Sequence, residues 1–163
     1  MGMMKWAAVV VLGGALAVIG AGQLGGFQGT APNDLGVRAG RLKPPSMSDN
    51  SVSSQASLHR GHPRQQAAQM APLAIRGDGP ATLAKIESVV QSMPGARVVT
   101  READYLYAQF TTPLMGFVDD VEFWFDPVAR VIQVRSASRI GESDLGLNRR
   151  RIEAVRAALA TAP

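Results

Sequence analysis

Residues 118–137 read VDDVEFWFDPVARVIQVRSA, and this stretch decides the fold. Val121, Phe123 and Phe125 alternate with acidic or aromatic neighbours, which is the two-residue period of a strand with one apolar face. A second apolar run follows Asp126-Pro-Val-Ala129, a segment short enough for a hairpin turn. The stretch therefore predicts two antiparallel strands in a sheet that is covered on its apolar face only.

The register of this hairpin assigns its side chains to faces. If the two middle residues of the turn form the tip, Asp119 lies on the core face opposite Ser136. Asp120 then lies on the outer face opposite Arg135. Because burial of an unpaired carboxylate is costly, we expect Asp119 to accept hydrogen bonds from Ser136 or from residues 50–55. Asp120 is expected to be exposed beside Arg135.

Apolar spacing outward from the hairpin predicts one globular domain over residues 72–163. Helical spacing predicts a helix between Pro80 and Pro94, and a second over 148–160 with Asn148 as its N-cap. Short apolar runs predict strands over 73–76, 96–102, 105–112, 118–125 and 130–137. The order β-α-β-β-β-β-α is typical of an α+β two-layer sandwich, an antiparallel sheet with two helices on one face. The expected core comprises Ile86, Val90, Phe123, Phe125, Ile132, Val134, Val155 and Leu159.

The first 27 residues form an apolar segment. From Trp6 to Asn33 the chain has no Asp, Glu, Lys or Arg, and the apolar part approaches the ~20 residues that span a bilayer as a helix. Such a segment is either a secretory signal or an uncleaved membrane anchor. Its length and Trp6 near its start favour the anchor. Residues 28–71, rich in Ser, Gly, Gln and Pro, predict an extended linker with docked turns.

Composition removes several classes of function. The chain has no Cys, which excludes disulfides, Cys-based zinc sites and a thiol nucleophile. His59 and His62 have no third ligand nearby in the sequence, so we expect no metal and no cofactor. The net charge of +4 comes from 17 basic residues dispersed among 13 acidic ones. Their one cluster, Arg149 to Arg151, has no interleaved aromatic residues, so we expect no nucleic-acid partner.

Four segments of the sequence, in their order along the chain, resemble motifs of an uncharacterised family, domain of unknown function 1499. They are DLGVRAGRL at 34–42, NSVSSQ at 50–55, VDDVEFWFD at 118–126 and the segment 134–153. The N-terminal motif of that family usually carries two Cys, where this chain has Pro45 and Ser51. Their joint absence would make sense if they form a disulfide in relatives. Members typically follow a signal or anchor segment, so the resemblance implies an extracytoplasmic, periplasmic position. It implies no activity.

The richest group of polar residues lies around the last predicted strand and the start of the last helix. A helix N-terminus with flanking arginines can bind an anion, although a capped helix tied to the sheet explains the same residues. The candidates for a polar or ligand site are Asp119, Ser136, Ser138, Arg139, Asn148 and Arg149. We assign no catalytic residue, because both His lie in the 28–71 segment and no nucleophile-elbow motif is present.

Three functions remain after these exclusions. The first is a membrane-tethered, extracytoplasmic, non-catalytic domain that binds a protein or envelope component. The second is a domain that binds a small anionic or amphipathic ligand between the sheet and the helices. A hydrolase-type enzyme is the third and has the least support from the residues.

Overall fold

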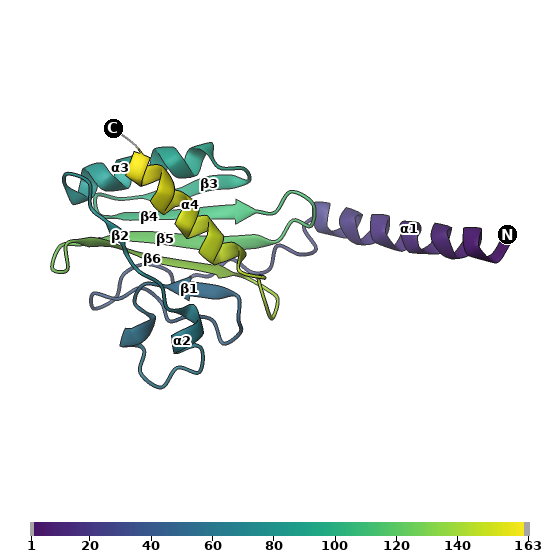
Figure 1. The fold of residues 1–163 in the computed structure, drawn as a ribbon, viewed down its shortest axis with the longest axis horizontal. Helices are drawn as coiled ribbons and strands as arrows, with labels where there is room; N and C mark the ends of the chain where they lie inside the picture. The colour runs from purple at the N-terminus through teal and green to yellow at the C-terminus, as the bar shows by residue number, and fades with distance from the viewer. Residues whose placement is uncertain (1, 162–163) are drawn as a thin grey trace.

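A computed structural model describes residues 2–161 and shows an α+β domain from which a long N-terminal helix projects (Figure 1). This confirms the predicted fold class. The strands are β1 (Ser51–Ser53), β2 (Leu73–Ala74), β3 (Ala96–Arg101), β4 (Tyr105–Thr111), β5 (Val118–Asp126) and β6 (Val131–Ser138). The helices are α1 (Gly2–Gln23), the 3-10 helix η1 (Ala56–Leu58), α2 (Gln65–Ala68), α3 (Gly79–Ser92) and α4 (Leu147–Thr161).

The described strands form one sheet in the order β1-β6-β5-β4-β3, and β2 also pairs with β6. Each of these pairs is antiparallel. Neither β1 nor its place beside β6 was expected, because the sequence predicted a linker there. The segment before Pro72 therefore completes one edge of the sheet.

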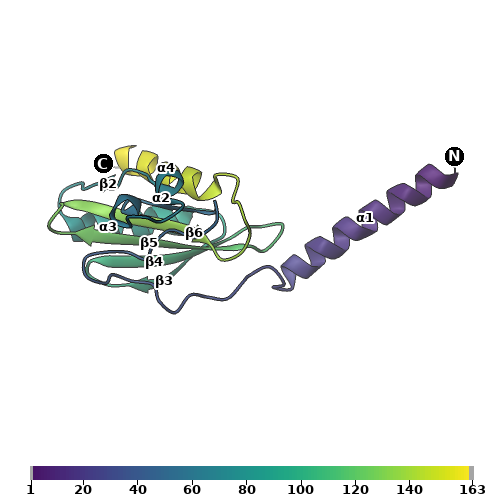
Figure 2. The same ribbon diagram turned by 90° about the horizontal axis from the view of Figure 1, so that it is seen from below.

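Helices α3 and α4 pack on one face of the sheet (Figures 1 and 2). Helix α3 begins where the carboxylate of Asp78 accepts a hydrogen bond from the backbone N–H of Ala81 (2.7 Å). The start of α4 differs from the prediction, because Asp144 caps it: its carboxylate accepts from the backbone N–H groups of Gly146 (2.9 Å) and Asn148 (2.7 Å). The side chain of Asn148 is buried instead and belongs to the interior.

The core lies between this face and the two helices, and its predicted composition is confirmed. Seven of the eight expected residues are buried in one cluster, and Phe125 is partly buried against it. Phe123 and Val134 are adjacent partners at the centre of the β5–β6 pair. The alternation of apolar residues thus identified the correct face of both strands.

The predicted register of the β5–β6 hairpin is wrong by two residues. The turn has four residues, Pro127 to Arg130, and Asp126 pairs with Val131. The carboxylate of Asp126 accepts from the N–H groups of Val128 (3.0 Å) and Ala129 (2.9 Å), which stabilises this longer turn. Because the shift is an even number, every side chain keeps its predicted face.

The second face of the sheet is also covered, which corrects the expectation that only one face is. We call residues 30–46 the covering segment. Leu42, with Leu35 and Val37 around it, packs on a layer of aromatic side chains from β4 and β5. Figure 2 shows the chain between α1 and β1 running along this side. These aromatic residues are Tyr105, Tyr107 and Trp124.

Helix α1 contacts the domain at its C-terminal end. The side-chain amide of Gln23 donates to the carbonyls of Pro113 (2.7 Å) and Leu114 (2.9 Å) in the β4–β5 loop. Just beyond the helix, Phe27 stacks on Phe117, with ring centroids 5.4 Å apart. From Trp6 to Gln23 the mean hydropathy is 1.8, and the helix is long and apolar enough to cross a membrane.

Candidate functional site

Strand β5 carries three acidic side chains in its first five residues, and each has its own arginine. The pairs are Asp119–Arg151 (2.6 Å), Asp120–Arg139 (2.8 Å) and Glu122–Arg135 (3.5 Å). All six side chains are nearly inaccessible to solvent. Buried charges of this kind persist in folded proteins when they are paired and hydrogen-bonded.

On the helix-covered face, Arg151 of α4 is the centre of a closed polar group. It donates to Asp119 Oδ2 (2.6 Å) and to Asn148 Oδ1 (2.7 Å), and its guanidinium lies 4.5 Å from the ring centroid of Phe110. Ser136 donates to the same Asn148 oxygen. Asp119 is buried as predicted, but its donor is Arg151 and not Ser136 or residues 50–55.

Asn148 also connects this group to the start of β1. Its amide nitrogen donates to the carbonyl of Asn50 (3.0 Å) and to Ser138 Oγ (3.1 Å). Asn50 in turn donates to the carbonyl of Gly141 (2.6 Å). Helix α4, strand β1 and the loop after β6 are therefore joined through side-chain amides that bond backbone groups.

On the other face, Asp120 contradicts the expectation of an exposed residue beside Arg135. Only 2% of Asp120 is exposed, because the covering segment lies over it. Arg139 donates two hydrogen bonds to the Asp120 carboxylate, from Nε (2.9 Å) and Nη2 (2.8 Å). The Tyr107 hydroxyl donates to the same carboxylate. Arg139, predicted to share a site with Asp119, thus belongs to the opposite face.

Glu122 holds the covering segment to the sheet. Its Oε1 accepts from the Tyr105 hydroxyl (2.8 Å) and from the backbone N–H of Gly36 (2.8 Å). Its partner Arg135 donates to the carbonyl of Pro44 (3.1 Å). Burial lowers the pKa of Arg135 from its ordinary value, and the charge of Glu122 opposes that shift. The covering segment is therefore bonded at two points to one buried ion pair.

The two tyrosines of the chain should ionise only at unusually high pH. Burial raises the pKa of both, and the negative charges of Glu122 beside Tyr105 and Asp120 beside Tyr107 act in the same direction. Above the ordinary tyrosine pKa of about 10, the folded protein keeps protons that the unfolded chain releases. The free energy of unfolding should therefore be unaffected by tyrosine below that pH and fall above it.

Tyrosinate absorbance in the near ultraviolet measures this directly, because the chain has only two tyrosines. We expect it to appear at higher pH in the folded protein than in urea, and Tyr107→Phe leaves Tyr105 as the single chromophore. Identical titration in the two states would contradict the buried placement of both hydroxyls.

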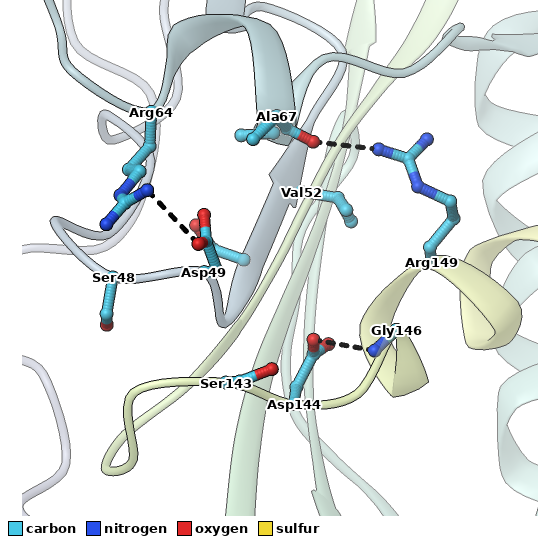
Figure 3. Close-up of a pocket in the computed structure, with 11 residues that line it drawn as sticks. Ser48, Asp49, Val52, Arg64, Ala67, Ser143, Asp144, Gly146 and Arg149 are labelled. Carbon is cyan, nitrogen blue, oxygen red and sulfur yellow. Dashed lines mark hydrogen bonds and ion pairs between the residues drawn. The ribbon is translucent and has the colours of Figure 1, made fainter.

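A cleft of about 200 Å³ opens at the start of α4 (Figure 3). Arg64 pairs with Asp49 across one side (3.1 Å), and Arg149 donates to the carbonyls of Ala67 (3.1 Å) and Gln69 (3.0 Å). Figure 3 shows Arg149 extended toward α2 and away from the backbone amides at the start of α4. Since Asp144 already accepts from those amides, an anion there would have to displace a carboxylate of the chain itself.

A second, more apolar pocket of about 210 Å³ lies beside the loop that follows β6. Phe117, Ile140, Leu145 and Leu147 supply its apolar walls, and Asp119 and Ser138 border it. Sites for drug-sized ligands usually enclose about 300 to 1,000 Å³, so this pocket suits at most a small group or one end of a chain.

Ser136 and His62 both have hydrogen-bond partners within the domain. The Ser136 hydroxyl bonds an amide oxygen and not a base. Within residues 2–161, no three His, Cys, Asp or Glu side chains lie close enough to hold a metal ion. His62 lies in the loop before α2, where its Nδ1 accepts from the N–H of Arg64 (3.2 Å).

The structure divides the predicted site residues among three places. Four of them, Asp119, Ser136, Ser138 and Asn148, meet in the group around Arg151. Arg139 lies on the opposite face and Arg149 lines the cleft of Figure 3. The residues of the polar groups that the sequence did not indicate are Tyr105, Tyr107, Glu122 and Arg151, whereas Arg135 was expected beside Asp120 and pairs with Glu122 instead. Helical spacing could have found Arg151, which is one turn from Asn148 and Val155 on the buried side of α4.

Taken together, the fold and its paired acidic and basic residues define a small α+β domain behind an apolar N-terminal helix. Residues 41–159 match a protein family described as "Protein of unknown function (DUF1499)". The chain belongs to this family. Comparisons with curated proteins and with solved structures give no match. The matched range includes β1, which is a strand of the sheet, and part of the covering segment, which packs on it.

The two positions at which the family resemblance leads one to expect Cys lie in one turn. Pro45 is buried, and Ser51 Oγ accepts from the backbone N–H of Ser46, the next residue, at 2.8 Å. A hydrogen bond thus closes this turn without a covalent link.

Proposed function

We propose that the protein is a membrane-anchored, extracytoplasmic, non-catalytic domain that binds a protein or another envelope component. The observation that carries the proposal is the contrast between the domain and its N-terminal helix. The acidic side chains at the start of β5 are bonded inside the fold, whereas α1 leaves its apolar side chains exposed. A helix of that length and composition is stable in a bilayer.

Binding rather than catalysis is supported by how the polar groups are used. Each carboxylate at the start of β5 is neutralised by a dedicated arginine, so none is a free general base. The cleft of Figure 3, in contrast, is edged by the Arg64–Asp49 ion pair, whose two side chains are partly exposed and available to a partner. A small cleft edged by both positive and negative side chains can bind a polar surface of a macromolecule through complementary charges.

Binding of an amphipathic ligand is a second candidate function, and one observation favours it. The pocket beside Leu145 combines apolar walls with the carboxylate of Asp119. However, Arg151 already neutralises that carboxylate, and the pocket is smaller than common ligand sites. We therefore place the binding of a macromolecule first.

Membrane fractionation tests the anchor. We expect the full chain to stay in the membrane pellet after alkaline carbonate treatment, with an intact N-terminus, and a chain that begins at residue 28 to be released. A C-terminal alkaline phosphatase fusion should be active, since that enzyme folds only outside the cytoplasm. A mature soluble protein that begins beyond residue 20, or an inactive fusion, would contradict the proposal.

Site-specific photocrosslinking in cells tests the binding surface. A photoreactive residue in place of Ala67, which is exposed in the cleft, should give one adduct of defined mass. The matched control is the same residue in place of Val128, exposed at the tip of the β5–β6 hairpin. Adducts at both positions, or at neither, would argue against a partner at the cleft.

A further inference from the structure

Exposed leucines gather at the end of the domain that holds α1. Leu24 follows the helix and is 90% exposed, Leu114 in the β4–β5 loop is 60% exposed, and Leu145 in the loop before α4 is 84% exposed. Thr112 and Phe117 of the β4–β5 loop line one pocket together with Leu145, so the two loops are neighbours. Singly exposed leucines are common, but three at one end of a small domain mark a contact surface.

The backbone of the β4–β5 loop touches the last turn of α1. Besides the two hydrogen bonds from Gln23, the loop approaches so closely that a Cβ on Gly116 would lie 2.4 Å from the carbonyl oxygen of Gly22. A Cβ on Gly22 would lie 2.3 Å from the carbonyl oxygen of Met115. Glycine at both positions permits this contact. The β4–β5 loop therefore lies beside the C-terminal end of the apolar part of α1.

We propose that this end of the domain rests on the bilayer that α1 crosses, with Leu24, Leu114 and Leu145 inserted in the interfacial layer. The inference rests on the membrane anchor proposed above and adds the orientation of the domain. In Figure 1, α1 projects from the end of the sheet where β4 ends and β5 begins. If α1 spans the bilayer, a loop that contacts its last turn must lie at the bilayer surface.

The conformation of Leu145 supports a contact with something outside the domain. Its φ is 51°, a left-handed value that is rare for a bulky residue, and its side chain is exposed rather than packed. The surroundings of Leu145 carry mixed charge, since Glu142 is exposed in the same loop and exposed Arg150 donates to the carbonyl of Leu145 (2.8 Å). We therefore assign the occupant as the apolar interface of the bilayer, and not as anionic headgroups held by charge.

Single-cysteine labelling of the full chain in phosphatidylcholine vesicles tests this orientation. The chain has no Cys, so each substitution creates one thiol for the fluorophore NBD. Leu114→Cys and Leu145→Cys should give blue-shifted NBD emission that is quenched by lipids with a doxyl group near the headgroup. Val128→Cys is the matched control, because Val128 is 93% exposed at the opposite end of the sheet. It should emit as in water and not be quenched.

Val11→Cys, in the middle of α1, separates the two proposals. If label at position 11 is quenched by deeply placed doxyl groups while labels at 114 and 145 behave like that at 128, the anchor stands and the orientation is overturned. If label at position 11 is not quenched, the anchor fails and the orientation fails with it. Quenching at 11, 114 and 145 but not at 128 supports both.

Discussion

Replacing Arg151 by alanine should lower the free energy of unfolding by about 3 to 5 kcal/mol, the cost of leaving a buried charge without its partner. Asp119 would keep a buried carboxylate, and Asn148 would lose a donor to its side-chain oxygen. The contact of the guanidinium with Phe110 would also disappear. Many domains are stable by only about 5 to 15 kcal/mol, so this variant should be marginally folded.

Urea unfolding of the chain from residue 28 onward measures this effect, with Arg150→Ala as the control. Arg150 is the preceding arginine of the same helix, is exposed and bonds the carbonyl of Leu145. Its removal should change stability by at most about 0.5 kcal/mol. The double variant Asp119→Leu, Arg151→Met should recover much of the loss, because apolar pairs often replace buried ion pairs without cost. Equal effects of the two single arginine variants would contradict the buried pair.

Starting the chain at Pro72 should abolish cooperative folding, whereas starting it at residue 28 should not. The shorter chain lacks β1 and the covering segment, so β6 becomes an edge strand apart from its short pairing with β2. Leu42 and Val52 are buried in the full domain, and each such side chain stabilises it by about 1.5 to 3 kcal/mol. Glu122 and Arg135 would also lose bonds to Gly36 and Pro44.

Circular dichroism and urea titration of the two chains distinguish these outcomes. We expect a single cooperative transition for the chain from residue 28 and a gradual change, or aggregation, for the chain from Pro72. A cooperative transition of the shorter chain at the same urea concentration would show that the covering segment contributes no stability.

Local patterns were sufficient for most of the strands and helices after Pro72. The alternation of Val121, Phe123 and Phe125 placed Asp119 and Asp120 on opposite faces, because side-chain direction depends only on position along a strand. The register was missed because it depends on the Asp126 side chain, which favours a four-residue turn over a two-residue one. An even shift leaves the faces unchanged, and so the core was found despite the error.

The second face could not be predicted in the same way. Leu35 and Val37 are two residues apart, but the alternation does not continue to Leu42, so a segment that carries them resembles a linker. The Asp119–Arg151 pair is equally hidden, since its residues are 32 positions apart in the sequence. Glu122–Arg135 is a pair across the hairpin, and it was missed because the expected register was two residues off. Pairing between distant residues such as Asp119 and Arg151 follows from tertiary packing.

The covering segment also determines how the domain responds to tension on its N-terminal helix. The chain leaves α1 at Gln23, crosses the outer face of the sheet and enters a strand only at β1. A pulling force would therefore first break the contacts of Gln23 and Phe27 with the β4–β5 loop. It would then break the bond of Gly36 to Glu122 and after it the bond of Pro44 to Arg135, one contact at a time. Peeling of this kind needs less force than sliding whole strands apart. Mechanical strain would uncover the tyrosine layer first and leave the helix-covered core intact.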